Sequence, residues 1–391
     1  MKQAYQALIK ALGRGAKGAR ELTLNESILL ISGFHSGIGS KVQLAAALML
    51  MRVRGESASE ISGVAIGIKS TIEKQWAEVK PTIDWPCYAG KRELLPWLLL
   101  AAKVLAAQGE RVLLHGDPKS LSHRKHIAAF VSALDIPRVS TAIEAKSALD
   151  SGGICYVDAD CFSPLVAKFR HLHQELGLRS LFQTAIRCTN PGNAPVSVRS
   201  YFHPGLDELH AEIAAIMAAY PADKIIDCGH SPLYESIYEC RSLERVGIFK
   251  GVQGESEINP RITTELTIVT NHSRDKKSRD KVSIPTLLEG VIGLNTLTST
   301  IQLESEQAPK LLAEVWLSKS GSDEAYRFMF HQQESAEKLM QLADASVIGT
   351  LAMVYLLNGR SEHFSDAEAL ARTSWFGRHD VLSKPLVHRV C

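Results

Sequence analysis

The sequence lacks the features that mark an exported, membrane-bound or disulfide-stabilised protein. Its seven cysteines are odd in number and form no C-x-x-C pair, which argues against a disulfide framework and a zinc knuckle. The basic N-terminus has no continuous apolar core with a small-residue cleavage pattern, so we expect no secretory signal. The strongest candidate for a membrane span, residues 94–107, contains Pro96 and Lys103 and is shorter than the roughly 20 residues that cross a bilayer. We therefore expect a cytoplasmic protein without a membrane segment, in which 94–107 is a buried helix.

An excess of one charge is also missing, since the formal net charge is only +2 over 391 residues. Any attraction for phosphate or nucleic acid must therefore come from local clustering of Lys and Arg. Hydrophobic residues make up 45% of the chain, and this length and composition predict a large core divided between two structural units.

Residues 1–72 carry helical signals almost exclusively. Ser40 is a candidate N-cap for a helix whose apolar residues recur at i, i+4 and i+7, and Gly55 stands where a left-handed C-terminal cap belongs. Ser57 and Glu60 have the S-x-x-E spacing of a capping box, which begins the next helix. This part of the chain is predicted to be a small helical domain.

From about residue 81, short apolar runs alternate with longer helical stretches. The candidate strands are residues 111–115, 153–157, 224–228, 245–249 and 265–269. Strands that alternate with helices favour an α/β sheet, in which ligands gather at the carboxyl ends of the strands. The polar run HSRDKKSRDK at 272–281 is predicted to be a surface loop, and helices are predicted at 334–357 and 365–371.

Several ordered segments carry a resemblance to a known family. The run LAAALMLMRVRGESASEISGVAIGI at 44–68 resembles the helical signature shared by anthranilate phosphoribosyltransferases and class II pyrimidine nucleoside phosphorylases. Further likeness lies in RVLLHG at 111–116, SPLVAKFRHLHQELGLRSLF at 163–182, TNP at 189–191 and GVQGESEIN at 251–259. The chain thus resembles glycosyltransferase family 3.

The resemblance implies an α/β fold with an all-α N-terminal domain, in the nucleoside phosphorylase and phosphoribosyltransferase arrangement. Residues 1–72 would form the helical domain, completed by about 162–188, and residues 78–161 and 189–391 the α/β domain. Because homologues pair through their helical domains, the resemblance also implies a homodimer.

The phosphate-binding motifs of the transferases are altered in this chain. Active phosphoribosyltransferases hold the donor diphosphate with a G-T-G-G-D loop, where this chain reads CYAGKRE. Gly90 remains, but Lys91 and Arg92 replace small residues whose backbone N–H groups would approach phosphate closely. The motif K-H-G-N-R survives only as His115 and Gly116. We therefore interpret the phosphoribosyl-diphosphate site as degenerate.

The metal-binding acids of the family are also incomplete. Its Asp-Glu pair aligns with Ser256 and Glu257, and Glu255 is the carboxylate that could compensate. Mg²⁺ is expected only if the chain is catalytically active, because one Glu is a poor anchor for it. Asp158 and Asp160 form a D-A-D after a candidate strand, although such a short motif is common by chance.

Arg179 matches the family's arginine that receives the anthranilate carboxylate, and its alternative interpretation is a structural arginine in a helix pair. His171 and His173 alternate on a predicted helix and should point to different faces, which is wrong for two ligands of one metal. We interpret both histidines as surface or packing residues.

The altered loop resembles that of DNA-binding paralogues of anthranilate phosphoribosyltransferase, which share a Tyr-x-Gly-x-Arg or Lys pattern and have no established transferase activity. Lys119, Arg124 and Lys125 lie in segments that would surround the donor pocket and, with the basic loop, would form a groove for polyanions. Trp85 and Tyr88 could stack on exposed bases of a single strand, or pack between the two domains instead.

Two functions follow from these observations. The first is a nucleic-acid-binding protein, for DNA or RNA, that is catalytically silent. The alternative is an active phosphoribosyl or glycosyl transferase that binds phosphoribosyl diphosphate at an altered site, with Glu257, Glu255 and Asp158 handling metal and Lys91 or Arg92 the diphosphate. A purely structural partner protein is a third class.

Overall fold

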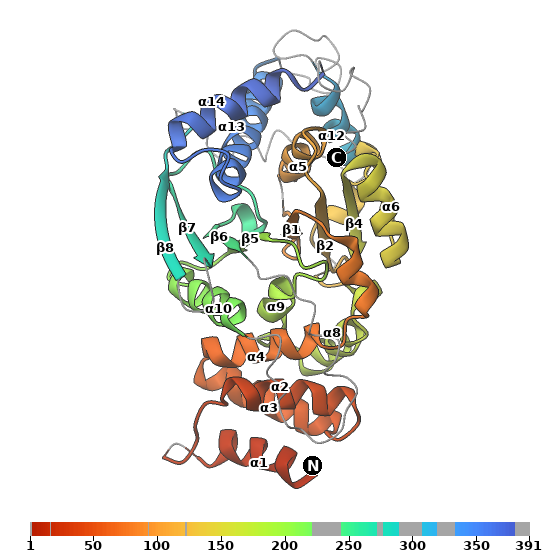
Figure 1. The fold of residues 1–391 in the computed structure, drawn as a ribbon, viewed down its shortest axis with the longest axis vertical. Helices are drawn as coiled ribbons and strands as arrows, with labels where there is room; N and C mark the ends of the chain where they lie inside the picture. Colours follow the sequence, from red (N-terminus) through yellow and green to blue (C-terminus); the bar gives the residue numbers. More distant parts are fainter. Residues whose placement is uncertain are drawn as a thin grey trace.

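The computed structural model describes residues 2–15, 17–92, 94–121, 123–220, 244–271, 277–288, 307–318 and 333–379. A helical bundle forms one end of the molecule and an α/β unit the other (Figure 1). The predicted fold class, α/β with an all-α N-terminal domain, is confirmed. Among the described cysteines, Cys87, Cys155, Cys161 and Cys188 are free.

Capping boxes define the helices of the bundle. The helices are α1 Lys2–Gly13, α2 Leu24–His35, α3 Lys41–Arg54 and α4 Ala58–Lys69. Ser40 and Ser57 cap α3 and α4 as predicted, and Gly55 ends α3 with a φ of 96°, which favours glycine. The capping Glu60 is fully buried, accepts a hydrogen bond from the backbone N–H of Leu22 at 3.0 Å and pairs with Arg54. One carboxylate therefore fixes the start of α4, the end of α3 and the segment before α2.

The α/β unit is built on a sheet of eight described strands in the order β3-β4-β2-β1-β5-β6-β7-β8. The first six are parallel where they pair, and β7 and β8 extend the sheet as an antiparallel hairpin. The strands are β1 Ile83–Pro86, β2 Val112–Gly116, β3 Arg138–Val139, β4 Ile154–Asp158, β5 Val196–Tyr201, β6 Arg245–Lys250, β7 Thr264–Asn271 and β8 Lys277–Ile284. Of the predicted strands, 111–115, 153–157, 245–249 and 265–269 are confirmed, and 224–228 lies outside the described residues.

The predicted surface loop at 272–281 is wrong over its second half. Residues 277–281 belong to β8, and 272–276 lie outside the described residues. The strand keeps its charges because it is an edge, with one side open to water. Lys281 contacts Glu265 at 2.9 Å, and Arg279 pairs with Glu208. Cross-strand and helix-to-strand ion pairs thus offset the polarity that suggested a loop.

Both faces of the sheet are covered, because neighbouring residues of one strand enter different cores. Val112 and Leu114 of β2 pack into the core beneath α5 and α13, whereas Leu113 packs into the core shared with the helical bundle. The remaining α-helices are α5 Leu98–Ala107, α6 Ala142–Gly152, α7 Ala159–Phe162, α8 Leu165–Leu176, α9 Phe182–Ala185, α10 Asp207–Ala219, α12 Gln307–Leu317, α13 Gln333–Leu357 and α14 Phe364–Phe376. Short 3-10 helices are η1 Lys74–Val79, η2 Ile127–Ala129, η3 Ser132–Leu134, η4 Ile186–Cys188 and η6 Val252–Gly254.

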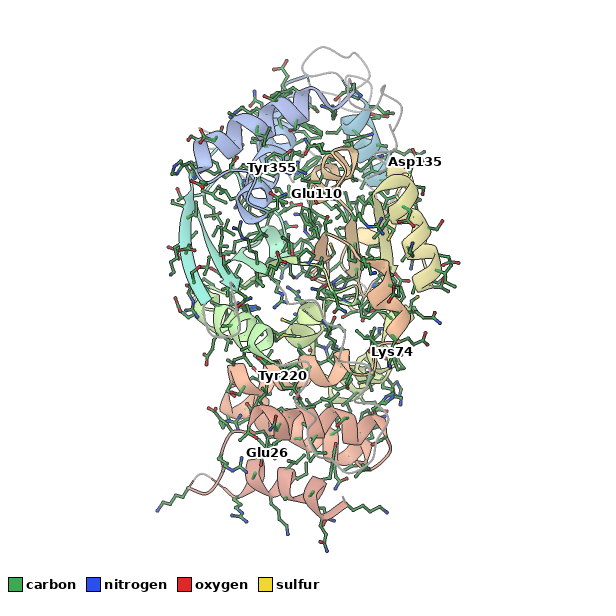
Figure 2. All side chains as sticks on the ribbon, viewed as in Figure 1. Glu26, Lys74, Glu110, Asp135, Tyr220 and Tyr355 are labelled. Atoms are coloured by element: carbon green, nitrogen blue, oxygen red, sulfur yellow. The ribbon has the colours of Figure 1, made fainter. Side chains whose placement is uncertain are left out.

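Helices α8, α9 and α10 lie between the sheet and the bundle (Figure 1), and α9 and α10 pack on α4. At the opposite end, α13 and α14 cover the sheet together with α5. Tyr355 and Glu110, labelled in Figure 2, mark the junction of α13 with the α5–β2 turn, where Tyr355 donates to Gln108 at 2.8 Å and Arg360 donates to Glu110 at 2.6 Å.

Two apolar helices are buried in the α/β unit. The prediction of a buried helix within 94–107 is confirmed by α5, which begins at Leu98, after Pro96. In α13 the segment Glu337–Leu357 is long and apolar enough to cross a bilayer, but 83% of its apolar window is buried inside the protein. Core helices of soluble proteins have the same property, so length and composition are weak evidence for a membrane span here.

Candidate polyanion-binding cleft

A cleft of about 570 Å³ lies between the helical bundle and the carboxyl ends of the central strands. Its walls come from α3, α4, α8, α9 and α10 and from the segments that follow β1, β2, β5 and β6. Ligand sites of α/β proteins form at this edge of the sheet, because the loops there converge from several parallel strands. The cleft is therefore the principal candidate site in the described part of the chain.

The charge of the cleft is strongly positive. Its arginines are Arg52, Arg92, Arg124, Arg170, Arg179 and Arg187, and its carboxylates are Glu56 and Asp117. Arg52 contacts Glu56 at 3.4 Å, and Arg170 contacts Asp117 at 2.7 Å, so each acid already has a cation. The other four arginines have no carboxylate within 4.0 Å among the described residues. They supply four positive charges to one concave surface.

These arginines repel one another. Burial lowers the pKa of the Arg179 guanidinium, and the charges of Arg187 and Arg52 lower it further. Burial likewise lowers the pKa of Arg124, with Arg92 and Arg179 acting in the same direction. Arginine nevertheless stays protonated near neutral pH. An anion in the cleft would relieve this repulsion, so the site is electrostatically suited to phosphate or carboxylate groups.

Three residues predicted for the site, Arg92, Arg124 and Arg179, are brought together in the cleft. Lys119 does not line it and contacts Asp160 at 3.0 Å. Lys125 joins the basic loop through its backbone, which forms an antiparallel bridge with Lys91. The sequence positions surrounding the expected donor pocket therefore contribute arginine side chains to the cleft, and the lysines serve other contacts.

His115 and Gly116 are packing residues at the end of β2. His115 is fully buried, and its ring nitrogens contact Asp84 Oδ1 at 3.0 Å and the Tyr88 hydroxyl at 2.8 Å. A Cβ on Gly116 would lie 2.3 Å from the carbonyl oxygen of Cys87, so only glycine allows the close approach. The His115 ring is held inside the protein, which corrects its prediction as a phosphate ligand, whereas backbone binding by Gly116 stays a prediction.

Lys91 is also placed differently from the prediction of an exposed cation. Its side chain is fully buried, and its ammonium group forms an ion pair with Glu257 Oε1 and approaches the Val252 carbonyl oxygen at 3.5 Å. The second oxygen of Glu257 accepts the backbone N–H of Leu98 at 2.9 Å, at the start of α5. The charge of Lys91 is neutralised inside the protein and does not belong to the cleft.

The loop of residues 90–92 has no backbone donors left for a diphosphate. The N–H of Gly90 donates to Glu255 Oε1, and that of Lys91 donates to the Lys125 carbonyl at 2.8 Å. The N–H of Arg92 donates to Gln253 Oε1 at 2.9 Å. Phosphate-cradling loops bind through such N–H groups, so this loop has lost that means of binding.

The acids expected for Mg²⁺ do not fit that ion. Both oxygens of Glu257 are used, and Lys91 supplies the positive charge that a metal would bring. Glu255 gives one oxygen to Gly90, its other oxygen is buried without a hydrogen-bond partner among the described residues, and burial raises its pKa. Mg²⁺ requires several oxygen ligands in octahedral geometry and usually keeps its waters. The lysine already neutralises Glu257, so a single free carboxylate oxygen, on Glu255, is left for the ion and is a poor anchor.

The D-A-D motif is likewise occupied by cations. Asp158 pairs with Arg138, and Asp160 contacts Arg170 at 2.8 Å as well as Lys119. Within the described ranges, no three or more His, Cys, Asp or Glu side chains form a group that could hold a metal ion. The arrangement holds α8 to the ends of β2 and β4 through Arg170.

The two aromatic residues predicted to stack on bases have different positions. Trp85 is fully buried in the α/β core and donates its Nε1–H to the Ser256 carbonyl at 3.1 Å, so the stacking prediction is wrong for it. Tyr88 lines the cleft but is only 8% exposed, with its hydroxyl held by His115. Phe202, which is 44% exposed, is the most exposed Phe or Tyr of the cleft among the described residues, and the sequence prediction did not include it.

The sequence prediction did not include several other cleft residues, two of them because strand β5 was not predicted. The run VSVRSY at 196–201 alternates apolar and polar residues, which is a strand signal, and its carboxyl end leads to Phe202 and His203. Arg187 comes two residues before the TNP segment and was not considered. His171 is exposed and contacts Glu175 at 3.0 Å, whereas His173 lines the cleft. The two histidines do face different ways, but His173 is a site residue.

The pH dependence of stability provides a test of the cleft's electrostatics at His210. Burial, followed by the charges of Arg187 and Arg199, lowers the pKa of His210 to about 4. Between pH 6.5 and 4 the unfolded chain binds a proton there that the native state does not, so stability falls as the pH falls. We expect this group to remove up to about 3 kcal/mol from the free energy of unfolding. Urea unfolding of the wild type and His210→Gln at pH 7 and 4.5 measures it, and an equal loss in both proteins would contradict it.

Comparison with known proteins agrees with this architecture. Residues 6–69 match the helical bundle domain of a glycosyl transferase family. The anthranilate phosphoribosyltransferase of Acetivibrio thermocellus is 25% identical over 267 residues, which are 68% of this chain and 70% of that protein. The enzyme of Shouchella clausii is 30% identical over 175 residues, which are 44% of this chain and 51% of that protein.

Solved structures show the likeness over nearly the whole chain. Anthranilate phosphoribosyltransferase from Thermus thermophilus has a TM-score of 0.64 and 17% identity, with coverage of 97% of this chain and 96% of that one. The enzyme from Saccharomyces cerevisiae in complex with PRPP and Mg has a TM-score of 0.60 and 14% identity, with coverage of 98% and 96%.

The helical bundle therefore matches the bundle domain of a glycosyl transferase family, and the candidate cleft lies between that bundle and the α/β unit. In sequence and in fold, the chain is similar to anthranilate phosphoribosyltransferases.

Proposed function

We propose that the protein binds nucleic acid through phosphate groups in the cleft and does not transfer phosphoribosyl groups. The observation that carries this proposal is the convergence of Arg92, Arg124, Arg179 and Arg187 on one open surface without carboxylate partners among the described residues. Guanidinium groups bind phosphate oxygens in bidentate geometry, and several of them in a row suit a polyanion better than a single small ligand.

The loss of transferase activity is supported by the altered loop. The backbone donors of residues 90–92 are occupied by protein acceptors, and Lys91 neutralises Glu257 where a metal would be required. A donor diphosphate would therefore lack both its backbone cradle and its cation. The related yeast enzyme, by contrast, has been solved with PRPP and Mg.

An active transferase with an altered donor site is the alternative, and one observation favours it. The chain shares its fold with phosphoribosyltransferases, and Arg179, the residue matched to anthranilate binding, lies in the same cleft as three other arginines that have no carboxylate within 4.0 Å among the described residues. In that case the arginine side chains would hold the diphosphate in place of backbone N–H groups. This function requires phosphoribosyl diphosphate to bind and to be consumed.

The salt dependence of binding tests the nucleic-acid proposal. A fluorescently labelled single-stranded oligonucleotide of mixed sequence should bind, with fluorescence anisotropy as the readout. Because each neutralised phosphate of a single strand contributes roughly 0.7 to the slope, four arginines predict a slope of log K against log[salt] of about −3. No binding at low salt, or binding that is independent of salt, would contradict the proposal.

We also propose a cytoplasmic homodimer that pairs through the helical domains. The free described cysteines support a reducing compartment, and α3 leaves Val42 and Val53 exposed by 77% and 88%. Exposed apolar side chains on one helix of the bundle support an interface there. Sedimentation of the wild type against Val42→Glu would test it: we expect a dimer that the variant weakens.

A further inference from the structure

Phe202 occupies an unusual place for a large apolar side chain. It directly follows β5, at the carboxyl end of a central strand, and exposes 44% of its surface in the wall of the cleft. The ring meets His203 edge to face, with 4.9 Å between ring centroids and an interplanar angle of 82°. A Cβ at Gly254, on the neighbouring segment after β6, would lie in ordinary contact with the ring, 3.4 Å from its Cδ2 atom. Neighbouring segments thus contact the ring while part of it stays accessible.

A second cavity begins at the same residue. It has a volume of about 310 Å³ and is lined by Leu94, Phe202, His203, Pro204, Lys250, Gly251, Val252, Gln253, Asn259, Arg261 and Ile262. Phe202, His203 and Gln253 line both this cavity and the arginine cleft. The two spaces therefore meet at the Phe202 ring, and the smaller one falls within the size range of sites for small ligands.

The charge of the second cavity resembles that of the cleft. Lys250 and Arg261 line it, and its lining includes no Asp or Glu among the described residues. Burial lowers the pKa of Arg261, whose Nε donates to Asn259 Oδ1 at 3.3 Å. Cations therefore line both of the cavities that share the accessible Phe202 ring, an arrangement that suits alternating phosphates and bases.

We propose that Phe202 is a base-stacking platform and that the ligand of the joined cavities is single-stranded nucleic acid. This inference rests on the proposed nucleic-acid function and specifies the class of its ligand. An aromatic ring stacks on a base only when that base is free of its neighbours, so a duplex cannot use this contact without being opened. The arginines hold the phosphates on one side of Phe202, and Lys250 and Arg261 hold those on the other.

Oligonucleotides that differ only in their bases separate stacking from charge. The probes are a labelled 12-nucleotide deoxythymidine strand, an abasic strand with the same number of phosphates, and a 12-base-pair duplex. Phe202→Ala should weaken binding of the deoxythymidine strand by roughly 5- to 100-fold while leaving the abasic strand unchanged. Phe376→Ala is a matched control, because Phe376 is also 44% exposed but lies at the end of α14, outside both cavities.

A reporter at the same position gives a second readout. The native tryptophans Trp76, Trp85, Trp97, Trp316 and Trp375 are all buried, so a Phe202→Trp side chain supplies the accessible signal. The deoxythymidine strand should quench its fluorescence, and the abasic strand should not. The inference is overturned if Phe202→Ala affects both strands equally or neither, or if the duplex binds as tightly as the single strand. If the abasic strand still binds in such a case, the proposed nucleic-acid function stands without the stacking role of Phe202. If no probe binds at low salt, both the stacking role and the proposed function are wrong.

Discussion

Replacing Arg179 and Arg187 together by alanine is expected to weaken oligonucleotide binding by roughly 20- to 60-fold at 0.1 M salt, because each lost phosphate contact removes the release of one counterion. The slope of log K against log[salt] should become shallower by about 1.4 for a single strand. Both arginines line the cleft, and neither has a carboxylate within 4.0 Å in the described part of the chain, although the charge of Arg187 lowers the pKa of the buried Glu255. Anisotropy titrations between 50 and 300 mM salt measure both quantities.

A matched variant distinguishes the cleft from the general surface charge. Arg372 lies on α14 outside the cleft and contacts Glu368 at 2.7 Å, so Arg372→Ala should change affinity and salt slope little. Equal losses in the two proteins would mean that binding is spread over the surface. The proposed role of the cleft would then be wrong.

Lys91→Ala is expected to lower the free energy of unfolding by about 3–5 kcal/mol, because it leaves the carboxylate of Glu257 buried without its cation. The same carboxylate accepts the N–H of Leu98 at the start of α5, so Glu257 links the loop of residues 90–92 to the core helix. Lys91→Ala removes the loop's side of that link. Urea unfolding at pH 7 measures the change. An exposed lysine in a phosphate groove would behave differently, because its removal would hardly change the free energy of unfolding.

The neutral pair Lys91→Met with Glu257→Gln provides the control. The glutamine oxygen still accepts the Leu98 N–H, and methionine fills the space of the lysine stem, so most of the lost stability should return. Oligonucleotide binding should be retained in the double variant, because neither side chain lines the cleft. A strong loss of binding in a stably folded double variant would show that Lys91 acts on the ligand after all.

Local patterns predicted the elements of this fold well, but they predicted its site only in part. Residues close together in the sequence determine the capping boxes at Ser40 and Ser57 and the apolar strands of the sheet. These elements can therefore be predicted from the sequence alone. The partner of Lys91 is 166 residues away, and nothing near residue 91 indicates that Glu257 will neutralise it. A basic run therefore suggested an exposed groove where the structure has a buried ion pair.

The missed parts of the cleft have a similar cause. Strand β8 is charged because it is an edge. Strand β5 is buried over residues 196–200, but its polar residues Ser197 and Arg199 form hydrogen bonds inside the protein, so it too lacks a continuous apolar run. Because β5 was not predicted as a strand, Phe202 at its carboxyl end was not predicted as a site residue. Arg124 and Arg179, by contrast, were predicted because they stand in segments that resemble the family, and both line the cleft.

Titration calorimetry with phosphoribosyl diphosphate, with and without Mg²⁺, beside a single-stranded oligonucleotide tests the central claim most directly. We expect the oligonucleotide to bind at physiological salt. Phosphoribosyl diphosphate should bind weakly, through the arginines, and Mg²⁺ should not strengthen that binding. Tight binding of phosphoribosyl diphosphate that depends on Mg²⁺, together with no binding of the oligonucleotide, would contradict the claim and favour the transferase.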